Sequence, residues 1–152
     1  MKLLFIATLL FSVPGIPTGN PFEKDQIKIN FAKTFPGVTN VVWVQEEENV
    51  KAVVEQEEIK THITYNPDGT VEKCIRYYSC KDLPAHIRAR VFEKYPDGKI
   101  LGVTETFEDN AMNYYIHIKN EENLIQLQAD PSGQLSKLSS VRDGSPRKKE
   151  KK

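Results

Sequence analysis

The chain has 152 residues, with 21 basic and 21 acidic side chains and a formal net charge of zero. A balanced charge argues against nucleic-acid binding, which needs a basic surface. The length suits one ordinary domain or two very small half-domains. Aromatic and β-branched residues are spread through the middle of the chain, which argues against long disordered regions.

The first 19 residues differ from the rest. One lysine precedes an apolar run from Leu3 to Val13, and prolines and glycines follow it. This order is typical of a signal peptide, and the run is too short to span a bilayer, which takes about 20 apolar residues. A buried N-terminal helix is the alternative. We therefore expect residues 1–19 to be a signal peptide, and the mature protein to be periplasmic or secreted with no membrane span.

The segment after residue 20 predicts one helix and four strands. Ile27, Phe31 and Phe35 recur every four residues, as on one face of a helix, and Pro36 ends the pattern. Four β-rich segments follow, at 39–46, 49–56, 59–66 and 70–78. The third alternates apolar and polar residues, which indicates a strand with one wet face. The sequence NPDG then marks a turn.

The same order recurs about sixty residues later. Apolar residues again recur every four positions, at Leu83, Ile87, Val91 and Tyr95. Four further strand-like segments follow, at 99–107, 112–119, 123–130 and 134–140. A chance alignment of two generic patterns is the alternative to a true tandem αββββ repeat with halves 22–80 and 81–141.

One αββββ unit of about 60 residues buries little apolar surface alone. We therefore expect the two units to join their sheets edge to edge. The predicted fold is α+β: one antiparallel sheet of about eight strands, with two helices packed on one face. Residues 142–152 are charged and poor in apolar side chains, so we expect a disordered tail.

Two cysteines, Cys74 and Cys80, lie close together in the sequence. In one extended strand their Cα atoms would be about 20 Å apart, whereas a disulfide needs them within about 7 Å. A bridge therefore requires a turn between them. Both a bridge and two free thiols stay open as interpretations, and the spacing matches no zinc motif.

Three segments resemble the PepSY-like domain of exported bacterial proteins, whose fold is likened to that of β-lactamase-inhibitor protein. They are FAKTFPGVTNVVW at 31–43, YNPDGTVEK at 65–73 and VFEKYPDGKI at 91–100. The resemblance covers nearly all of 22–141, although Asp97 replaces Gly37 and Val103 replaces Trp43 in the second half. It implies a periplasmic, non-catalytic domain of two αββββ units. Related domains are associated with restraining peptidases, and some carry a calcium-regulated label.

No residue pattern predicts catalysis. The histidines, His62, His86 and His117, lie outside any recognised nucleophile and base motif, so we predict no enzyme and no catalytic residues. His62 and His117 could meet across the sheet and bind a metal ion, but no third ligand is suggested, so exposed single histidines are the simpler interpretation. The acidic turns lack the spacing of a calcium loop, and no phosphate-binding loop is present. We predict no cofactor and no metal, with calcium as a minor option.

The remaining candidate site is the sheet face that points away from the helices. If Ile63 and Ile75 point toward the helices, this open face carries His62, Arg76, Tyr78, Tyr115, His117, Gln126 and Gln128. Tyrosine and arginine are common interface anchors, although an ordinary polar sheet face is the alternative.

We therefore predict an exported non-catalytic binding module. It would inhibit or restrain a peptidase or another periplasmic protein or peptide through the open face, as a monomer or an edge-paired dimer. The alternative function is a periplasmic small-ligand or calcium-responsive sensor.

Overall fold

A computed structural model describes residues 21–144 of the chain. The predicted signal peptide and residues 145–152 of the predicted tail lie outside the described residues. The two α-helices are α1 (Pro21–Thr34) and α2 (Ala85–Lys94). The strands are β1 (Val41–Glu46), β2 (Asn49–Gln56), β3 (Ile59–Tyr65), β4 (Val71–Tyr78), β5 (Lys99–Glu108), β6 (Ala111–Lys119), β7 (Asn123–Ala129) and β8 (Leu135–Arg142).

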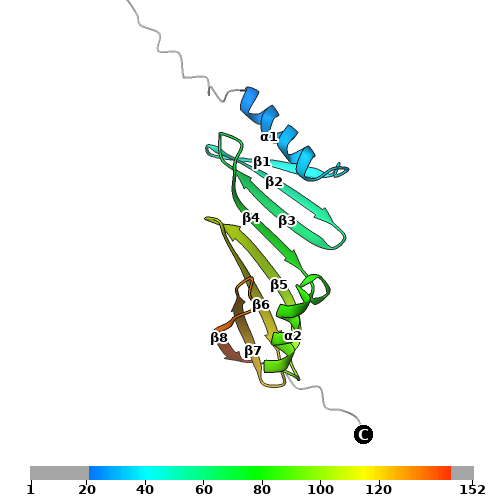
Figure 1. Cartoon of the computed structure of the whole chain (residues 1–152), viewed down its shortest axis with the longest axis vertical. Coiled ribbons are helices and arrows are strands. Elements are labelled where there is room, and N and C mark those ends of the chain that lie inside the picture. The colour runs from blue at the N-terminus through cyan, green and yellow to red at the C-terminus, as the bar shows by residue number, and fades with distance from the viewer. Residues whose placement is uncertain (1–20, 145–152) are drawn as a thin grey trace, which may run out of the picture.

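The strands form one antiparallel sheet in sequence order, β1 to β8. A short 3-10 helix, Cys80–Asp82, and α2 connect β4 to β5. Figure 1 shows the sheet running along the long axis of the molecule, with α1 near β1 and β2 and α2 beside the last strands. The prediction of an α+β fold with an eight-stranded antiparallel sheet and two helices is confirmed. Within residues 21–144, neither helix combines the length and apolar character of a membrane span.

Both helices pack on the same face of the sheet. Cys74 packs against the buried cluster under α1, and Tyr78 belongs to the cluster under α2. These two residues lie four apart on β4, and side chains an even number apart on a strand point to the same side. We call this side the helix face and the opposite side the open face.

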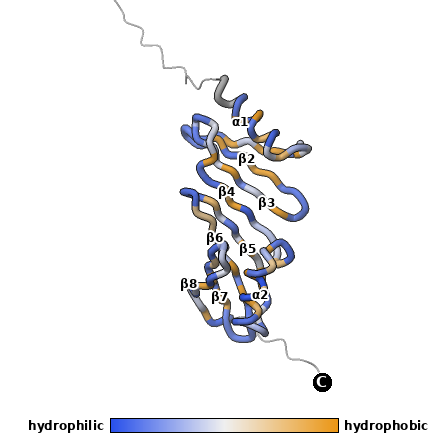
Figure 2. Tube along the Cα trace, viewed as in Figure 1, coloured by the Kyte–Doolittle hydropathy of each residue, from blue (hydrophilic) through white to orange (hydrophobic). Residues whose placement is uncertain are grey.

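Two hydrophobic clusters lie between the helices and the sheet. Ile27 and Phe31 of α1 cover a cluster on β2 and β3 that includes Ala52 and Ile63. Helix α2 covers a larger cluster, whose buried members are Tyr78, Leu83, Ile87, Val91, Ile100, Val103, Tyr114, Ile116, Ile118, Ile125, Leu127 and Ala129. Figure 2 shows that hydrophobic residues concentrate along the strands, whereas the turns are hydrophilic. The four-residue apolar spacing of each helix therefore marks the side that contacts the sheet.

The ends of both helices follow from the residues that come after them. Helix α1 ends at Thr34, two residues before Pro36, and Gly37 adopts a positive φ of 82° in the turn that leads to β1. Helix α2 ends at Lys94, and Tyr95 caps it before Pro96. Because proline has no backbone N–H and restricts the residue before it, neither helix can continue through these positions.

Strand β8 extends through Arg142, the first residue of the predicted tail, and Asp143 is ion-paired with Lys119. The sheet therefore reaches slightly further than the sequence indicated. Cys74 and Cys80 are both free thiols, which decides between the two interpretations left open by their spacing. Burial raises the pKa of the Cys74 thiol.

The hairpin turn between β2 and β3 is built from two glutamates in the left-handed region, Glu57 at φ 51° and Glu58 at φ 67°. This conformation suits asparagine and glycine, and other L-residues are strained in it. We expect the double variant Glu57→Asn/Glu58→Gly to melt about 2–4 °C higher than the wild type. The measurement is thermal unfolding followed by circular dichroism.

The control for this turn is Glu55→Gly, on the neighbouring strand β2. That residue has no positive φ, so glycine there adds only chain entropy and should lower the melting temperature. If the turn variant melted no higher than the wild type, the left-handed conformation of Glu57 and Glu58 would not be a source of strain.

Candidate functional site

The register of the sheet decides which side chains share the open face. His62 on β3 lies opposite Ile75 on β4, and Tyr115 on β6 lies opposite Gln128 on β7. His117 lies opposite Gln126 in the next row of the same two strands. All of these residues alternate with buried residues that point to the helices. The structure therefore places five predicted site residues on the open face: His62, Tyr115, His117, Gln126 and Gln128.

The predicted placement of Arg76 and Tyr78 on the open face is wrong. Because His62 and Ile75 are directly opposite, Ile75 lies on the open face, and Arg76 and Tyr78 point toward the helices. Tyr78 is only 6% exposed. The sequence of β4, VEKCIRYY, has apolar side chains in both phases, so its alternation does not distinguish the two faces.

Arg76 and Tyr78 share one buried partner on the helix face. Glu105 of β5 is 9% exposed, and Arg76 Nη1 donates a hydrogen bond to its Oε1 at 3.0 Å. The hydroxyl of Tyr78 donates to Oε2 at 2.6 Å. Burial, followed by this hydrogen bond to Glu105, raises the pKa of Tyr78. The three side chains satisfy one another inside the fold, which assigns Arg76 and Tyr78 a structural role.

The open face is hollowed where β5, β6, β7 and β8 lie side by side. This β5–β8 hollow has a volume of about 470 Å³. Three exposed aliphatic side chains contribute to it: Leu101, Leu124 and Val141. Three polar side chains also line the hollow: His117, Gln126 and Ser139. An exposed apolar group surrounded by polar side chains is a feature of interaction sites.

Gly102 lies in the β5–β8 hollow, next to an irregularity in the pairing of β5 with β6. A Cβ atom added at this position would meet no other atom within 4 Å, and the backbone there is open to all residues. The hollow therefore exists partly because this position lacks a side chain. Sequence reasoning missed Leu101, Leu124 and Val141. For Leu124 and Val141, an apolar side chain in the polar phase of the strand was the available signal, whereas Leu101 shares the phase of Val103 and gave none.

The other half of the open face is occupied by closed ion pairs. Lys51 pairs with Glu46, and Lys73 Nζ lies 2.9 Å from an Oε atom of Glu108. His62 lies among these groups, and its Nε2 has no hydrogen-bond partner within the described part of the chain. Burial, followed by the charges of Lys60 and Lys51, lowers the pKa of His62. This half offers a partner fewer unpaired groups than the β5–β8 hollow.

The structure does not bring the candidate metal ligands together. His62 and His117 are separated by β4 and β5, three strand spacings or about 14 Å across the sheet, and Asn113 rather than His117 lies in the row of His62, so the two histidines are further apart still and cannot share a metal ion. Within residues 21–144, no group of three histidine, cysteine or acidic side chains could hold a metal. Asp68, in the turn considered for calcium, accepts hydrogen bonds from the backbone and hydroxyl of Thr70, which lower its pKa.

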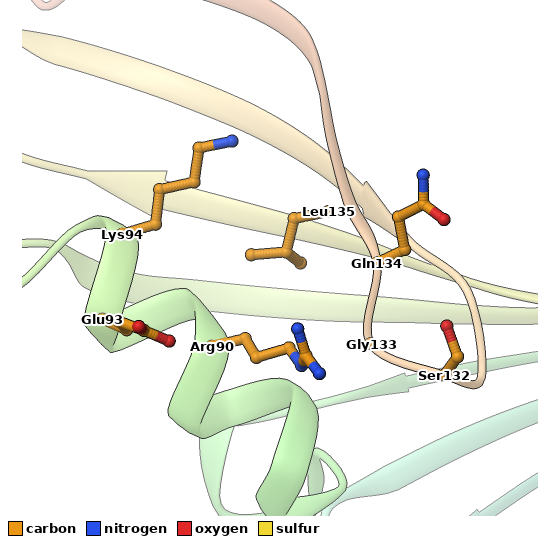
Figure 3. Close-up of a pocket in the computed structure, with 7 residues that line it drawn as sticks. All are labelled: Arg90, Glu93, Lys94, Ser132, Gly133, Gln134 and Leu135. Carbon is orange, nitrogen blue, oxygen red and sulfur yellow. The ribbon is translucent and has the colours of Figure 1, made fainter.

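A second hollow, of about 620 Å³, lies on the helix side between α2 and the turn from β7 to β8. Figure 3 shows Arg90 and Lys94 extending from α2 beside Ser132, Gly133 and Gln134 of that turn. His86 Nε2 lies 3.0 Å from the carbonyl oxygen of Pro131, and an added Cβ at Gly133 would come within 3.0 Å of the Arg90 side chain. These contacts fasten α2 to the turn, so we assign this hollow a structural role.

Comparison with known proteins gives a match in fold alone. No protein-family model and no curated protein matches the chain. Among solved structures, a BLIP-like protein of Bacteroides fragilis matches with a TM-score of 0.58 and 14% identity, over 81% of this chain and 88% of that one. A DUF2874 family protein of Bacteroides ovatus matches with a TM-score of 0.56 and 18% identity, over 77% and 85%.

An inferred periplasmic protein of Bacteroides eggerthii matches similarly, with a TM-score of 0.56 and 17% identity, over 78% of this chain and 87% of that one. Each match extends over most of both chains. At these identities the matches establish a common architecture. The chain therefore has a BLIP-like fold, shared with solved proteins of the DUF2874 family.

Proposed function

We propose that the chain is an exported, non-catalytic binding module that holds a periplasmic protein or peptide in the β5–β8 hollow of its open face. The observation that carries the proposal is the exposure of three aliphatic side chains there. Leu101 is 52% exposed, Leu124 37% and Val141 58%. A soluble protein gains nothing from such a group in water, whereas a partner side chain placed in the hollow would bury it.

The polar groups around the hollow support a protein or peptide as the partner. Within residues 21–144, the side chains of His117 and Gln126 make no hydrogen bond to other protein groups. They are available to the backbone of a bound segment, while the aliphatic side chains receive an apolar anchor. Tyr115 and Gln128, in the neighbouring row, extend the same surface toward the centre of the sheet.

Further features of the sequence support export and a restraining role. The N-terminal signal-peptide pattern supports transfer to the periplasm, and the resemblance to PepSY-like domains together with the BLIP-like fold supports binding to a peptidase or a similar target. In this proposal the partner is inhibited by occupation of its own surface, because the module contributes no reacting group.

We also propose that the two halves are copies of one αββββ unit. The turns at 66–70 and 130–134 support this, since each has a glycine at positive φ, 85° at Gly69 and 83° at Gly133. Each turn also closes with a backbone hydrogen bond between its first and last residues. The β5–β8 hollow with its exposed aliphatic side chains lies on the second copy, so the proposed binding function belongs to that copy.

A small apolar ligand is the second candidate occupant. The hollow's volume of about 470 Å³ falls within the range of small-ligand sites, and its polar side chains lie beside the apolar ones. This version corresponds to a periplasmic sensor of small molecules. It differs from the first proposal in that a purified small molecule, without any protein, would bind.

The test uses Gly102→Leu, whose Cβ would meet no other atom within 4 Å and whose side chain would occupy part of the hollow. Proteins captured from periplasmic extract on wild-type protein would be identified, and the affinity of each for purified variants measured by titration. We expect Gly102→Leu to weaken binding at least about tenfold, because the apolar anchor loses its place. A captured protein whose affinity were unchanged by Gly102→Leu would contradict the proposed site.

The matched control is Thr64→Leu, which adds a similar side chain to the other half of the open face. It should leave binding unchanged. Capture repeated with calcium and with a chelator separates a calcium-responsive function from a purely protein-binding one. The sensor function is tested with purified protein alone. Small apolar compounds that bind the wild type without any protein partner should no longer bind Gly102→Leu, and titration measures this loss.

A further inference from the structure

The sheet has two edge strands, β1 and β8, and they differ in how they are protected. Strand β8 carries Lys137 and Arg142, and its pairing with β7 is interrupted by an irregularity. Charges and bulges of this kind discourage pairing with another strand. Strand β1, VVWVQE, pairs with β2 without irregularity and contains no lysine, arginine or proline. Its single charge, Glu46, is paired with Lys51.

Two exposed valines lie on β1. Val42 is 62% exposed and Val44 39% exposed, and both point to the open face. Val42 begins a row that continues through Val53 to His62 and Ile75. Helix α1 contacts β1 through the rings of Phe31 and Trp43 on the helix face, and among the described strands β1 pairs with β2 alone. Strand β1 is therefore an apolar edge with an unprotected backbone.

The two-residue turns fix which backbone groups of β1 point outward. Glu46 and Asn49 flank the turn from β1 to β2, so they form a hydrogen-bonded pair, and alternation makes Val44 and Val42 the next residues bonded to β2. The turn from β2 to β3, between Gln56 and Ile59, leads to the same assignment of the residues whose backbone groups join β1 to β2. The N–H and C=O groups of Trp43 and Gln45 therefore point away from the sheet. The carbonyl of Val41 does so as well, while its N–H bonds to Thr39 at 3.2 Å.

We propose that β1 pairs with β1 of a second copy of this chain, antiparallel, about a two-fold axis at Trp43. In this register Trp43 faces Trp43 of the second copy, and Val41 faces Gln45. The N–H and C=O groups of the two Trp43 residues then bond to each other, and the N–H of each Gln45 meets the carbonyl of Val41 of the other strand. Val42 faces Val44 of the second copy on the open face, so the valine row becomes continuous across the dimer.

The chemistry of β1 favours a second copy over a foreign strand. A register centred on Val44 would place the apolar Val42 opposite the charged Glu46. The register centred on Trp43 opposes valine to valine and places Glu46 opposite Asn40, so no like charges meet. The strand is thus complementary to itself. The contact is short, so the dimer is expected to exchange with monomer at micromolar concentrations.

The test compares two double variants that differ only at position 42. In Val42→Glu/Val44→Glu, glutamates oppose each other across the axis. In Val42→Lys/Val44→Glu, each lysine faces a glutamate of the second copy. Because Val44 lies beside Lys51 on β2, the Val44→Glu change is favourable within the chain in both variants. Sedimentation equilibrium across a concentration series gives the dimer dissociation constant, and thermal melting confirms that both variants fold.

We expect the wild type and the lysine–glutamate variant to dimerise, and the double-glutamate variant to bind itself at least about tenfold more weakly. A wild type that stays monomeric throughout the series overturns the proposal and leaves the edge to a strand of another protein. A folded double-glutamate variant that still dimerises like the wild type overturns the assignment to β1. If both variants weakened equally, the register centred on Trp43 would be wrong.

Discussion

Replacing Leu127 with alanine is expected to lower the free energy of unfolding by about 3 kcal/mol. Leu127 is fully buried at the centre of β7, opposite Ile116, in the cluster that α2 covers. Alanine would remove most of its side chain and leave a cavity between the sheet and the helix, which rigid neighbouring strands can fill only in part. A loss of this size is a large fraction of the stability of a small domain.

Urea unfolding at equilibrium, monitored by circular dichroism, measures this loss. The matched control is Leu138→Ala on the neighbouring strand β8, where the leucine is 47% exposed. The same atoms are deleted in both variants, but Leu138 is already in contact with water, so its loss should stay within about 0.5 kcal/mol. Equal losses in the two variants would show that α2 does not cover β7 as described.

The helices and strands could be predicted because each follows from local patterns. The four-residue spacing of Ile27 and Phe31, and of Ile87 and Val91, marks the buried side of each helix whatever the rest of the chain does. Proline after each helix, and glycine in the turns at 66–70 and 130–134, fix where those elements end. Strands β6 and β7 alternate cleanly, so Tyr115 and His117 were assigned to the correct face.

Strand β4 could not be assigned from its own sequence. Ile75 appeared to be its buried residue, yet Cys74, Arg76 and Tyr78 occupy the helix face. What makes a half-buried arginine possible on the helix face is Glu105, which lies 29 residues further along the chain. A pattern within one strand carries no information on such a partner. The register of β4 against its neighbours, which places Ile75 opposite His62 and Arg76 opposite Glu105, decides the face.

The β5–β8 hollow could not be predicted from the sequence, for a related reason. Its lining comes from four strands, and its depth depends on the absence of a side chain at Gly102. The irregularity in β5 next to Gly102 also leaves Leu101 exposed, although simple alternation would place it on the same side as the buried Val103. A local sequence window shows the apolar residues but not that they meet. The site therefore arises from pairing between strands rather than from a motif.

Replacing Arg76 with methionine is expected to lower the free energy of unfolding by about 2 kcal/mol, the second large effect. Methionine keeps much of the length of the side chain and removes its charge. Glu105 would then remain buried with only the Tyr78 hydroxyl as a hydrogen-bond donor. The arginine itself is 39% exposed, so water can reach the site in part, and the expected loss is smaller than for a fully enclosed pair.

The structure contains a matched control for this variant on the same two strands. Lys73 and Glu108 also face each other across β4 and β5, but on the open face, with side chains 35% and 49% exposed. Lys73→Met should therefore change stability by less than about 0.5 kcal/mol, as is usual for surface ion pairs. Similar losses for Arg76→Met and Lys73→Met would mean that burial of Glu105 does not determine the cost.

The double variant Arg76→Met/Glu105→Gln distinguishes the loss of the attraction between Arg76 and Glu105 from the cost of leaving the Glu105 carboxylate unpaired. Glutamine carries no charge and still offers an oxygen that can accept the hydrogen bond from Tyr78. Because the main cost of Arg76→Met is the unpaired carboxylate, the double variant should recover most of the loss. Additive losses from the two changes would place the cost in the packing of the arginine stem over the Tyr78 ring, 5.5 Å from its guanidinium carbon.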